Sequence, residues 1–272
     1  MNHVVERDRY LWVSGINKTW RKKQVINKRA KSGIQIADLY IGKRERIAVL
    51  GPSGSGKSTF LKLLAKDINV DAGSIYFLDK SLDDWSHQEL SCYRAVLPQS
   101  QELTFDFSVD LIVELGCVNQ KNLPNLEVRQ LIKNSLECAC ASHLAGQLYT
   151  NLSGGEKARV QLARVFAQMW GVCEGLLLVD EPFAALDPYL QIALLSNLGE
   201  FAKQRDLTVI AILHDINHAV QYFDRALFVR AGQVSLDKPM NRVSRIDLEN
   251  LYGIKFFELL ADNGKTYFFP QN

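Results

Sequence analysis

The chain has 272 residues, of which 47% are hydrophobic and 23% charged, and its formal net charge is +2. This composition is that of an ordinary globular protein, long enough to bury a sizeable core without metals or disulfides. The balance of 32 basic and 30 acidic residues argues against a dedicated nucleic-acid-binding protein, which usually has a strong basic excess. The five cysteines form no C-x-x-C pair, so a reducing compartment is favoured over a secreted disulfide framework.

The beginning of the chain and its apolar stretches indicate a soluble protein. Residues 1–12 carry charges where a secretory signal requires an apolar run. The longest apolar stretches, such as residues 209–213, are far shorter than the roughly 20 residues that a membrane span requires. If the protein works at a membrane, we expect a partner to hold it there.

The first third of the chain predicts strands, a glycine loop and a helix. Residues 32–50 alternate or run apolar, as strands do, and residues 60–68 have the spacing of a helix. Before them, residues 19–33 are basic and are predicted to form a solvated turn between two strands, with a phosphate or lipid contact as the alternative.

The middle of the chain predicts helices. Residues 128–140 and 156–170 have helical periodicity, and long β-branched runs are missing between residues 100 and 172. We therefore predict a mostly helical subdomain inserted into an α/β core. Within it, Cys138 and Cys140 are two residues apart, a spacing that points two thiols away from each other on a helix, so they are interpreted as packed small residues.

Strands and helices alternate again in the last third. The apolar runs at residues 176–180 and 207–213 predict strands buried on both faces of a parallel sheet, and residues 188–205 predict a helix between them. Alternation at both ends of the chain indicates an α/β fold. A tail follows Gly232, and its end, residues 265–269, could add a strand.

The strongest local motif is GPSGSGKST at residues 51–59, which matches G-x-x-x-x-G-K-[ST] between a predicted strand and a predicted helix. Such a loop turns its backbone amides toward phosphate oxygens, and the following helix points its positive end at the same charge. A lysine in this loop reaches the β- and γ-phosphates and a serine hydroxyl ligates Mg²⁺. The predicted ATP-binding residues are Gly51, Pro52, Ser53, Gly54, Ser55, Gly56, Lys57, Ser58 and Thr59, with Lys57 and Ser58 in those two roles. A flexible Gly/Ser linker is the alternative, and the flanking elements disfavour it.

A second motif, LLLVDEP, ends the predicted strand at residues 176–180. Asp180 is predicted to hold Mg²⁺ at the carboxyl end of this buried strand. Glu181 follows on a different face and could polarise the attacking water as a general base. Without the phosphate loop, the better interpretation would be a simple turn that closes a strand.

A third motif, at residues 151–168, supplies a second phosphate-binding helix end. Its residues are Leu152, Ser153, Gly154, Gly155 and Glu156. Ser153 can cap the helix that follows, and the glycines leave the first amides open to an anion. One nucleotide site needs only one such cradle, so the second is explained if it serves a nucleotide held by another copy of the chain.

These motifs together resemble those of ABC ATPases. The sequence LSGGE resembles the family's signature, Gln99 its Q-loop, residues 184–187 its D-loop and His214 its switch histidine. The resemblance covers nearly the whole chain. The D-loop residues that it implies are Ala185, Leu186 and Asp187.

The resemblance implies one P-loop NTPase domain of the ABC-ATPase fold. Its RecA-like α/β core would span residues 1–99 and 173–235, with an N-terminal antiparallel β region, a helical subdomain at residues 100–172 and a tail at residues 236–272. It also implies a head-to-tail homodimer with two ATP molecules and Mg²⁺ at the interface. Gln99 would contact Mg²⁺ or water, and His214 would donate a hydrogen bond to the γ-phosphate.

The aromatic residue that stacks on adenine is expected to be Trp20, because its segment resembles the one used in the family. Tyr10 and Trp12 are the alternative candidates for stacking. The purely structural interpretation is an aromatic residue that packs in the sheet and does not contact the nucleotide. His214 and His218 have the spacing of a zinc site on a helix, but no third ligand is evident.

Residues 106–116, 156–170 and 247–256 resemble the ATPases of bacterial importers for iron complexes, haem and cobalamin, with haem importers nearest. The resemblance implies integral membrane permease subunits as partners, an indirect periplasmic or surface substrate-binding protein, and a place at the cytoplasmic face of the cell membrane. Siderophore, cobalamin and phosphonate importers are the alternatives. Beyond transport, the rivals are a soluble ABC protein acting on ribosomes or DNA and a P-loop kinase or NTPase that works alone. Glu156, Lys157 and Phe183 depart from the residues common in the family, without removing a catalytic group.

Overall fold

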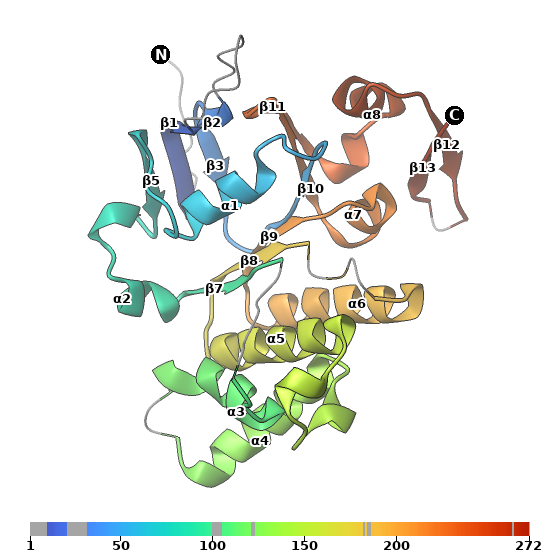
Figure 1. Cartoon of the computed structure of the whole chain (residues 1–272). Coiled ribbons are helices and arrows are strands. Elements are labelled where there is room, and N and C mark those ends of the chain that lie inside the picture. Colours follow the sequence, from blue (N-terminus) through green and yellow to red (C-terminus); the bar gives the residue numbers. More distant parts are fainter. Residues whose placement is uncertain are drawn as a thin grey trace, which may run out of the picture. The chain divides into compact units, whose positions relative to one another are not determined.

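The computed structural model describes residues 10–20, 32–99, 105–120, 123–181, 183, 186–262 and 264–271. The chain forms two compact units, the first combining Met1–His87 with Ala211–Asn272 and the second consisting of Gln88–Ile210. Figure 1 shows the helices and strands of both units. Strand β9 (Thr208–Ile212) begins in the second unit and ends in the first.

An antiparallel sheet forms one part of the first unit. Its strands are β1 (Leu11–Trp20), β2 (Ser32–Ile36), β3 (Leu39–Ile41), β5 (Ala72–Phe77) and β6 (Lys80–Ser81). They pair in the order β2-β1-β5-β6, and β3 also pairs with β1. This sheet confirms the predicted antiparallel β region. Of the basic segment, residues 21–31 lie outside the described residues, and the strands that flank it pair antiparallel, as a turn between two strands requires.

The alternation of buried and more exposed residues along β1 is interrupted at a β-bulge. Leu11, Val13 and Ile16 are buried, so the alternation slips by one residue after Val13. At this point Gly15 has a φ of +57°, and the register to β5 is irregular. A Cβ atom on Gly73 would lie 2.4 Å from the Gly15 carbonyl oxygen, so the two backbones approach each other more closely than a side chain would allow.

A second set of strands in the first unit positions the candidate site. Strands β4 (Arg46–Leu50) and β10 (Arg225–Arg230) are parallel, and β11 (Gln233–Pro239) pairs antiparallel with β10. Four of the five residues of β4 are buried, as expected for a strand covered on both faces. Helix α1 (Lys57–Leu64) follows β4, and helix α7 (Ile216–Tyr222) follows β9. The predicted order of strand, glycine loop and helix is confirmed.

The tail adds a helix and a hairpin to the first unit. Helix α8 (Arg245–Tyr252) begins with a capping box of Ser244 and Asp247 and ends at Gly253, which has a left-handed conformation. Strands β12 (Phe256–Leu260) and β13 (Thr266–Pro270) then pair antiparallel. The predicted strand at the end of the chain is therefore confirmed, while α8 and β12 were not predicted.

The second unit consists of two parallel strands and a group of helices. Strands β7 (Arg94–Leu97) and β8 (Leu176–Asp180) are parallel, and every residue of β8 is buried. The helices are α2 (His87–Ser91), α3 (Val109–Glu114), α4 (Asn125–Cys138), α5 (Gly154–Met169) and α6 (Pro188–Gln204). Helix α5 packs against α3 and α4, so residues 100–172 contribute helices where a helical subdomain is predicted.

The boundaries of the two compact units differ from the predicted boundaries of the helical subdomain. The divisions fall after His87 and after Ile210, so that β7, β8 and α6 belong to the same unit as the helical segment. The prediction of a single ABC domain with boundaries at residues 99 and 172 stays a prediction. All five cysteines are free thiols, including Cys138 at the end of α4 and Cys140 just beyond it. Over the described ranges, none of the helices combines the length and the hydrophobicity needed to cross a bilayer.

Candidate functional site

The glycine loop at residues 51–59 joins the buried strand β4 to helix α1. Gly56 caps α1 with a φ of +108°, no side chain caps the first turn, and that turn holds no acidic residue. The first amides of α1 therefore meet no carboxylate of their own helix, and the helix dipole adds positive potential at the same place. This end of α1 is suited to an anion.

The loop has room only for glycine at its first position. A Cβ atom on Gly51 would lie 2.1 Å from the Val229 carbonyl oxygen and 3.0 Å from the Ser55 hydroxyl oxygen. That hydroxyl is buried and is one of the buried polar groups of the described residues for which no hydrogen-bond partner is found. The backbone thus forms a cradle that a side chain would fill, and the fit to a phosphate group rests on this geometry and on the end of α1.

Lys57 is held inside the loop. Its side chain is only 5% exposed, and its ammonium donates hydrogen bonds to the carbonyl oxygens of Gly51 at 2.8 Å and Pro52 at 3.2 Å. The charge therefore lies at the loop that would surround a phosphate. Tyr252 of α8 is a further neighbour that the sequence did not reveal: burial raises the pKa of Tyr252 to about 12, and the nearby Gly51 backbone opposes this rise by favouring the charged form.

The aromatic candidates for adenine stacking differ in the surface that they offer. Trp20 ends β1 and is 43% exposed, with the Lys18 ammonium 5.6 Å from its ring centroid. Trp12 stacks on Tyr40 at 5.7 Å and on Tyr76 at 5.0 Å between ring centroids.

Tyr10 is 1% exposed and packs edge-on against Phe77. Trp12 is therefore stacked against two other rings and Tyr10 is buried, so Trp20 is the most exposed of the three candidates, and its stacking on adenine stays a prediction.

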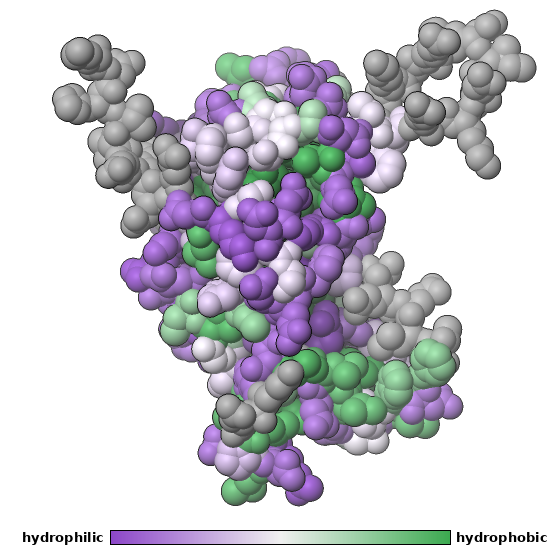
Figure 2. Space-filling model, turned by 90° about the vertical axis from the view of Figure 1, so that its left-hand side faces the viewer, coloured by the Kyte–Doolittle hydropathy of each residue, from purple (hydrophilic) through white to green (hydrophobic). Residues whose placement is uncertain are grey.

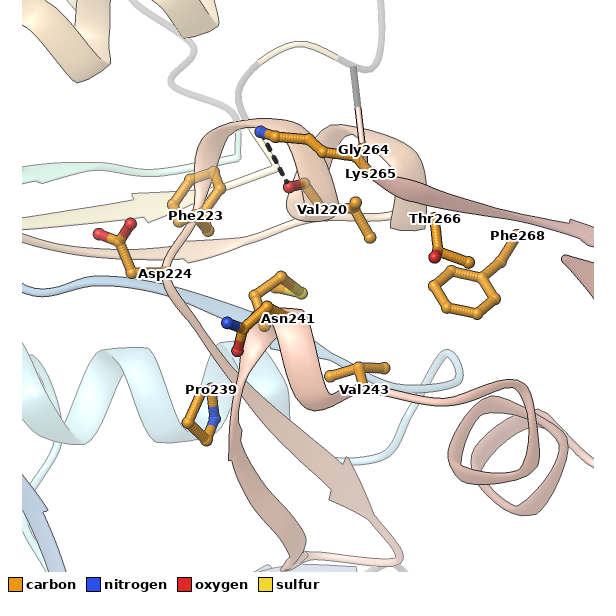
Figure 3. A pocket seen from close by; sticks show the side chains of 11 residues that line it. Val220, Phe223, Asp224, Pro239, Asn241, Val243, Gly264, Lys265, Thr266 and Phe268 are labelled. Carbon is orange, nitrogen blue, oxygen red and sulfur yellow. Dashed lines mark hydrogen bonds between the residues drawn. The ribbon is translucent and has the colours of Figure 1, made fainter. Parts of the chain in front are cut away.

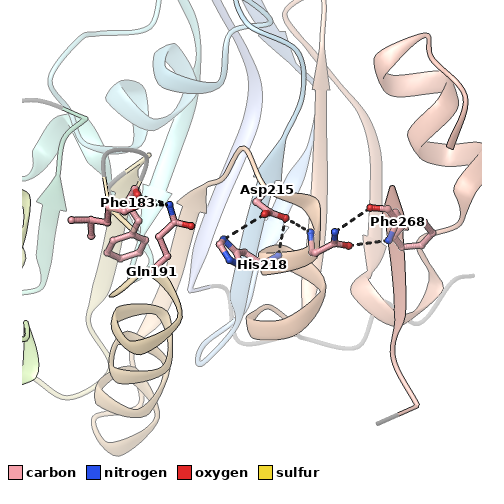
Figure 4. A network of polar contacts seen from close by, with 7 residues as sticks. Phe183, Gln191, Asp215, His218 and Phe268 are labelled. Carbon is pink, nitrogen blue, oxygen red and sulfur yellow. Dashed lines mark hydrogen bonds and ion pairs between the residues drawn. The ribbon is translucent and has the colours of Figure 1, made fainter. Parts of the chain in front are cut away.

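His214 lies just beyond the end of β9, before helix α7. Strand β9 ends at Ile212, one residue earlier than the strand predicted at residues 207–213, and the His214 side chain is exposed. Asp215 caps α7 by accepting hydrogen bonds from the backbone amides of Asn217 at 2.7 Å and His218 at 3.3 Å. Figure 4 shows Asp215 and the hydrogen bonds that it accepts from the first turn of α7.

In the second unit, Gln99 and Glu181 come together. Asp180 ends β8 and is 6% exposed, while the Gln99 side-chain amide donates a hydrogen bond to the Glu181 carboxylate at 2.7 Å. Strand β8 ends at Asp180, so strand alternation does not set the direction of the Glu181 side chain. Glu181 instead has a left-handed φ of +48°, which costs a non-glycine residue about 1–3 kcal/mol and turns the chain sharply.

The start of helix α5 carries the signature residues. Leu152 is buried, whereas Ser153 and Gly154 are exposed. Ser153 caps the helix as predicted, since its hydroxyl accepts a hydrogen bond from the Glu156 amide. The Glu156 carboxylate in turn accepts from the Ser153 amide at 2.8 Å and from its hydroxyl at 2.7 Å.

This capping box adds the Glu156 carboxylate to the cap that was predicted for Ser153. The bonds from Ser153 hold the pKa of Glu156 below its usual value, so a negative charge stands beside the first turn. The amides of Gly154 and Gly155 are not part of the box.

Comparison with known proteins identifies the family. A sequence profile described as "ABC transporter" matches residues 34–184. A hemin import ATP-binding protein of Gloeobacter violaceus is 43% identical over 194 residues, covering 70% of this chain and 70% of the relative. One of Pseudomonas aeruginosa is 40% identical over 212 residues, covering 78% and 82%. The chain belongs to the ABC transporter family.

The solved structures agree with this membership. A metal-chelate type ABC transporter in an inward-facing conformation is similar with a TM-score of 0.76 at 25% identity, covering 97% of this chain and 98% of that chain. The chain therefore has the α/β P-loop fold of ABC ATPases, and it is an ATP-binding, ATP-hydrolysing subunit of the ABC type. The family assignment made from the sequence motifs is confirmed.

The D-loop of this ABC subunit is only partly described, because Ala185 lies outside the described residues. Asp187 caps α6 by accepting a hydrogen bond from the Leu190 amide at 3.0 Å. The Gln191 side chain donates to the carbonyl oxygens of Phe183 at 3.0 Å and Leu186 at 2.9 Å (Figure 4). Gln191 thus ties the D-loop turn to the first turn of α6, a role that no sequence pattern indicated.

Metal binding by protein ligands alone has no support in the described part of the ABC subunit. There, no three His, Cys, Asp or Glu side chains are grouped so that they could hold a metal ion. His218 instead lies with its Nδ1 4.0 Å from the Asp215 carboxylate. Mg²⁺ bound together with ATP needs fewer protein ligands, because the phosphates and water supply the rest.

Proposed function

We propose that this ABC ATPase powers a bacterial importer for haem or another iron complex. The proposal is supported by the names of the relatives from G. violaceus and P. aeruginosa, both hemin import ATP-binding proteins, and by the similarity to a metal-chelate type transporter. Importers of siderophores, cobalamin or phosphonates are the alternatives. The transported molecule does not touch this subunit, so its identity depends on the permease.

ATP is proposed to bind with its phosphates in the glycine loop. Gly51 and Gly56 shape the backbone cradle, Lys57 supplies the charge for the β- and γ-phosphates, and Trp20 stacks on the base. Ser58, Gln99 and Asp180 are the proposed Mg²⁺-binding residues, directly or through water. When bound, Mg²⁺ neutralises the charge on the phosphate oxygens.

Hydrolysis is assigned to Glu181, with His214 as a hydrogen-bond donor to the γ-phosphate. The observation that carries this assignment is the Glu181 carboxylate, which follows a buried strand in a strained turn and accepts a hydrogen bond from Gln99 at 2.7 Å. A carboxylate held in this way can take the proton of an attacking water, and Gln99 links its position to the helical segment that follows.

The subunit is proposed to work as a homodimer at the cytoplasmic face of the membrane. The signature end of α5 would contact the ATP held by the Lys57 loop of a second copy. A permease subunit would dock on the helical part of the second unit, where Figure 2 shows hydrophobic side chains gathered over the lower part of the visible face. Exposed apolar side chains on and beside α3 and α4 are Phe105, Leu111, Leu115, Val118, Leu126 and Leu148.

Replacing Glu181 by Gln tests the catalytic assignment. Because Gln cannot accept the proton, kcat should fall about 100-fold or more while ATP still binds. ATP and Mg²⁺ should then trap a dimer that gel filtration detects. Glu174→Gln is the matched control, since Glu174 also has a left-handed backbone, with a φ of +59°, but precedes β8 rather than follows it.

A monomer of Glu181→Gln with wild-type turnover would remove Glu181 from the mechanism. The substrate is tested separately in a strain that lacks this gene and is given haem as its only iron source. Growth should return with the wild-type gene and not with Glu181→Gln. Growth of the deletion strain on haem at the wild-type rate would remove haem as the substrate and leave the other importers.

A further inference from the structure

The terminal hairpin, formed by β12 and β13, is attached to α7 by a pair of hydrogen bonds. The Asn217 side-chain amide donates to the Phe268 carbonyl oxygen at 3.1 Å, and the Phe268 amide donates back to the Asn217 side-chain oxygen at 2.9 Å. Asn217 thus pairs with β13 in the way a neighbouring strand would. Figure 4 shows Phe268 at the end of this network.

The hairpin also holds the other end of the same helix. Lys265 donates from its ammonium to the carbonyl oxygens of Gln221 at 2.6 Å and Val220 at 3.4 Å, in the last turn of α7. A cation at this position satisfies carbonyl groups that have no partner within the helix. Helix α7 has only 7 residues, so the hairpin reaches both its first and its last turn.

Part of the hairpin borders a cavity. Figure 3 shows this space, of about 470 Å³, between Gly264 to Phe268 on one side and Pro239 to Val243 on the other, with Val220 and Phe223 of the α7 end also lining it. Apolar packing also attaches the hairpin, since Phe256 and Phe268 are each only 3% exposed and the Phe256 ring centroid lies 6.1 Å from that of Tyr252. The hydrogen bonds of Asn217 and Lys265 add a directional attachment to α7 itself.

The position of α7 in turn fixes the turn that bears His214. Asp215 accepts hydrogen bonds from the Asn217 and His218 amides, so the residue that follows His214 is bound to the first turn of the helix. His214 directly precedes Asp215 in the chain, so the position of its backbone follows that of this turn. A shift or rotation of α7 would therefore move His214.

We propose that the terminal hairpin is a brace that sets the position of His214 for ATP hydrolysis, with Asn217 as the positioning residue. The proposal rests on the role of His214 in the proposed function. It makes the hairpin of β12 and β13 a support for the histidine that the proposed function assigns to hydrolysis.

The test is a double-mutant cycle on ATPase activity. Asn217→Ala should lower kcat about 10-fold, because misplacement of a catalytic group by a fraction of an ångström is costly, and should leave the KM for ATP within about twofold. In a His214→Ala background the same change should alter the remaining rate by less than about twofold, since there is no imidazole left to position.

Two further variants separate positioning from a general loss of stability. Lys265→Met removes the contact at the other end of α7 and should lower kcat in the same way, with a smaller effect. Asn197→Ala is the matched control in the second unit, because its side-chain amide also donates to a backbone carbonyl oxygen, that of Cys138, at 2.9 Å. It should leave kcat unchanged.

The outcomes distinguish this inference from the proposed function. If His214→Ala turns over like the wild type, the role of His214 fails and the brace fails with it. If His214→Ala is inactive but Asn217→Ala and Lys265→Met keep full kcat, only the brace is overturned. Equal losses from Asn217→Ala with and without His214 would also overturn it, because a merely structural contact acts independently of the imidazole.

Discussion

Helices α1 and α5 both begin in glycine-containing segments, yet their first turns are built in opposite ways. Gly56 begins α1 without any side-chain cap and without an acidic residue in the first turn. Ser153 begins α5 with a complete capping box, closed by the carboxylate of Glu156. One helix end depends on a ligand to satisfy its amides, and the other satisfies part of them itself.

The difference suits two kinds of contact with phosphate. A helix end without its own anion gains the most from a bound phosphate, which is the need of the loop that holds ATP throughout the cycle. A capped end keeps its helix intact when no nucleotide is near, since an acidic group at this position interacts favourably with the helix dipole. Such stability is useful at a surface that would contact the partner's nucleotide only when two copies of the chain come together as a closed dimer.

Lys57→Ala should have the largest effect, because it removes the ammonium group that lies inside the loop and donates to the Gly51 and Pro52 carbonyl oxygens. ATP affinity should fall about 10- to 100-fold, the cost of losing charge-assisted hydrogen bonds to phosphate, and turnover should fall with it. Calorimetry with ATP measures the affinity. Lys62→Ala, on the exposed side of the same helix, is the matched control, and unchanged affinity in Lys57→Ala would mean that the phosphates bind elsewhere.

Ser153→Arg should separate binding from closure at the other helix end. Arginine places bulk and charge where the partner's γ-phosphate would dock, so ATPase activity should be lost while ATP binding by the single subunit stays within about twofold of the wild type. Ser153→Ala is the control, since it removes the cap, worth about 1 kcal/mol, without adding bulk, and should keep more activity. Full activity in Ser153→Arg would mean that the end of α5 has no role in hydrolysis.

Mixing the two inactive variants tests whether each site is shared between two copies. In a head-to-tail dimer of one Ser153→Arg and one Lys57→Ala subunit, both lesions fall on the same composite site and the other site is intact. The mixture should therefore regain ATPase activity, provided that one intact site turns over alone. No recovery in mixed dimers that demonstrably form would contradict independent composite sites.

The sequence predicted the parts of this site that depend on local pattern. The apolar run of β4, the glycines of the loop and the helical spacing of α1 follow one another along the chain, so the cradle around Lys57 was predictable. Contacts between distant segments were not, because a single sequence carries no record of strand pairing. Examples are the stacking of Trp12 between Tyr40 and Tyr76, and the pairing of Asn217 with Phe268 across 51 positions.

Local backbone strain and side-chain geometry also escaped prediction. Glu181 leaves the strand through a left-handed turn, which residue propensity disfavours for glutamate, so only the surrounding structure can impose it. The capping box on α5 was readable in principle, since serine followed three positions later by glutamate is its signature. The interpretation of those residues as an open anion site took the glycines into account and not the carboxylate.

Glu156→Gln should have the smallest effect and should show it only as a dependence of stability on pH. The Ser153 hydrogen bonds hold the pKa of Glu156 in the folded protein below its ordinary value of 4.5. A group whose pKa is lowered on folding stabilises the fold above its unfolded pKa, and this contribution is lost as the pH falls through the folded pKa. Wild type should therefore melt at a higher temperature than Glu156→Gln near pH 7, and the difference should shrink as the pH falls through the lowered pKa of Glu156 in the folded protein.

Thermal unfolding at several pH values checks this prediction, with Ser153→Ala as the second background. Removing the Ser153 hydroxyl takes away the largest cause of the lowered pKa, so the pH-dependent part of the Glu156→Gln effect should be smaller there than in the wild type. A difference that keeps the same size at every pH would mean that Gln disturbs the capping box for another reason than charge. Helix α1 has no acidic residue in its first turn, so no equivalent Glu→Gln substitution can be made there. The negative charge of Glu156 in the first turn of α5 is therefore what distinguishes the starts of the two helices.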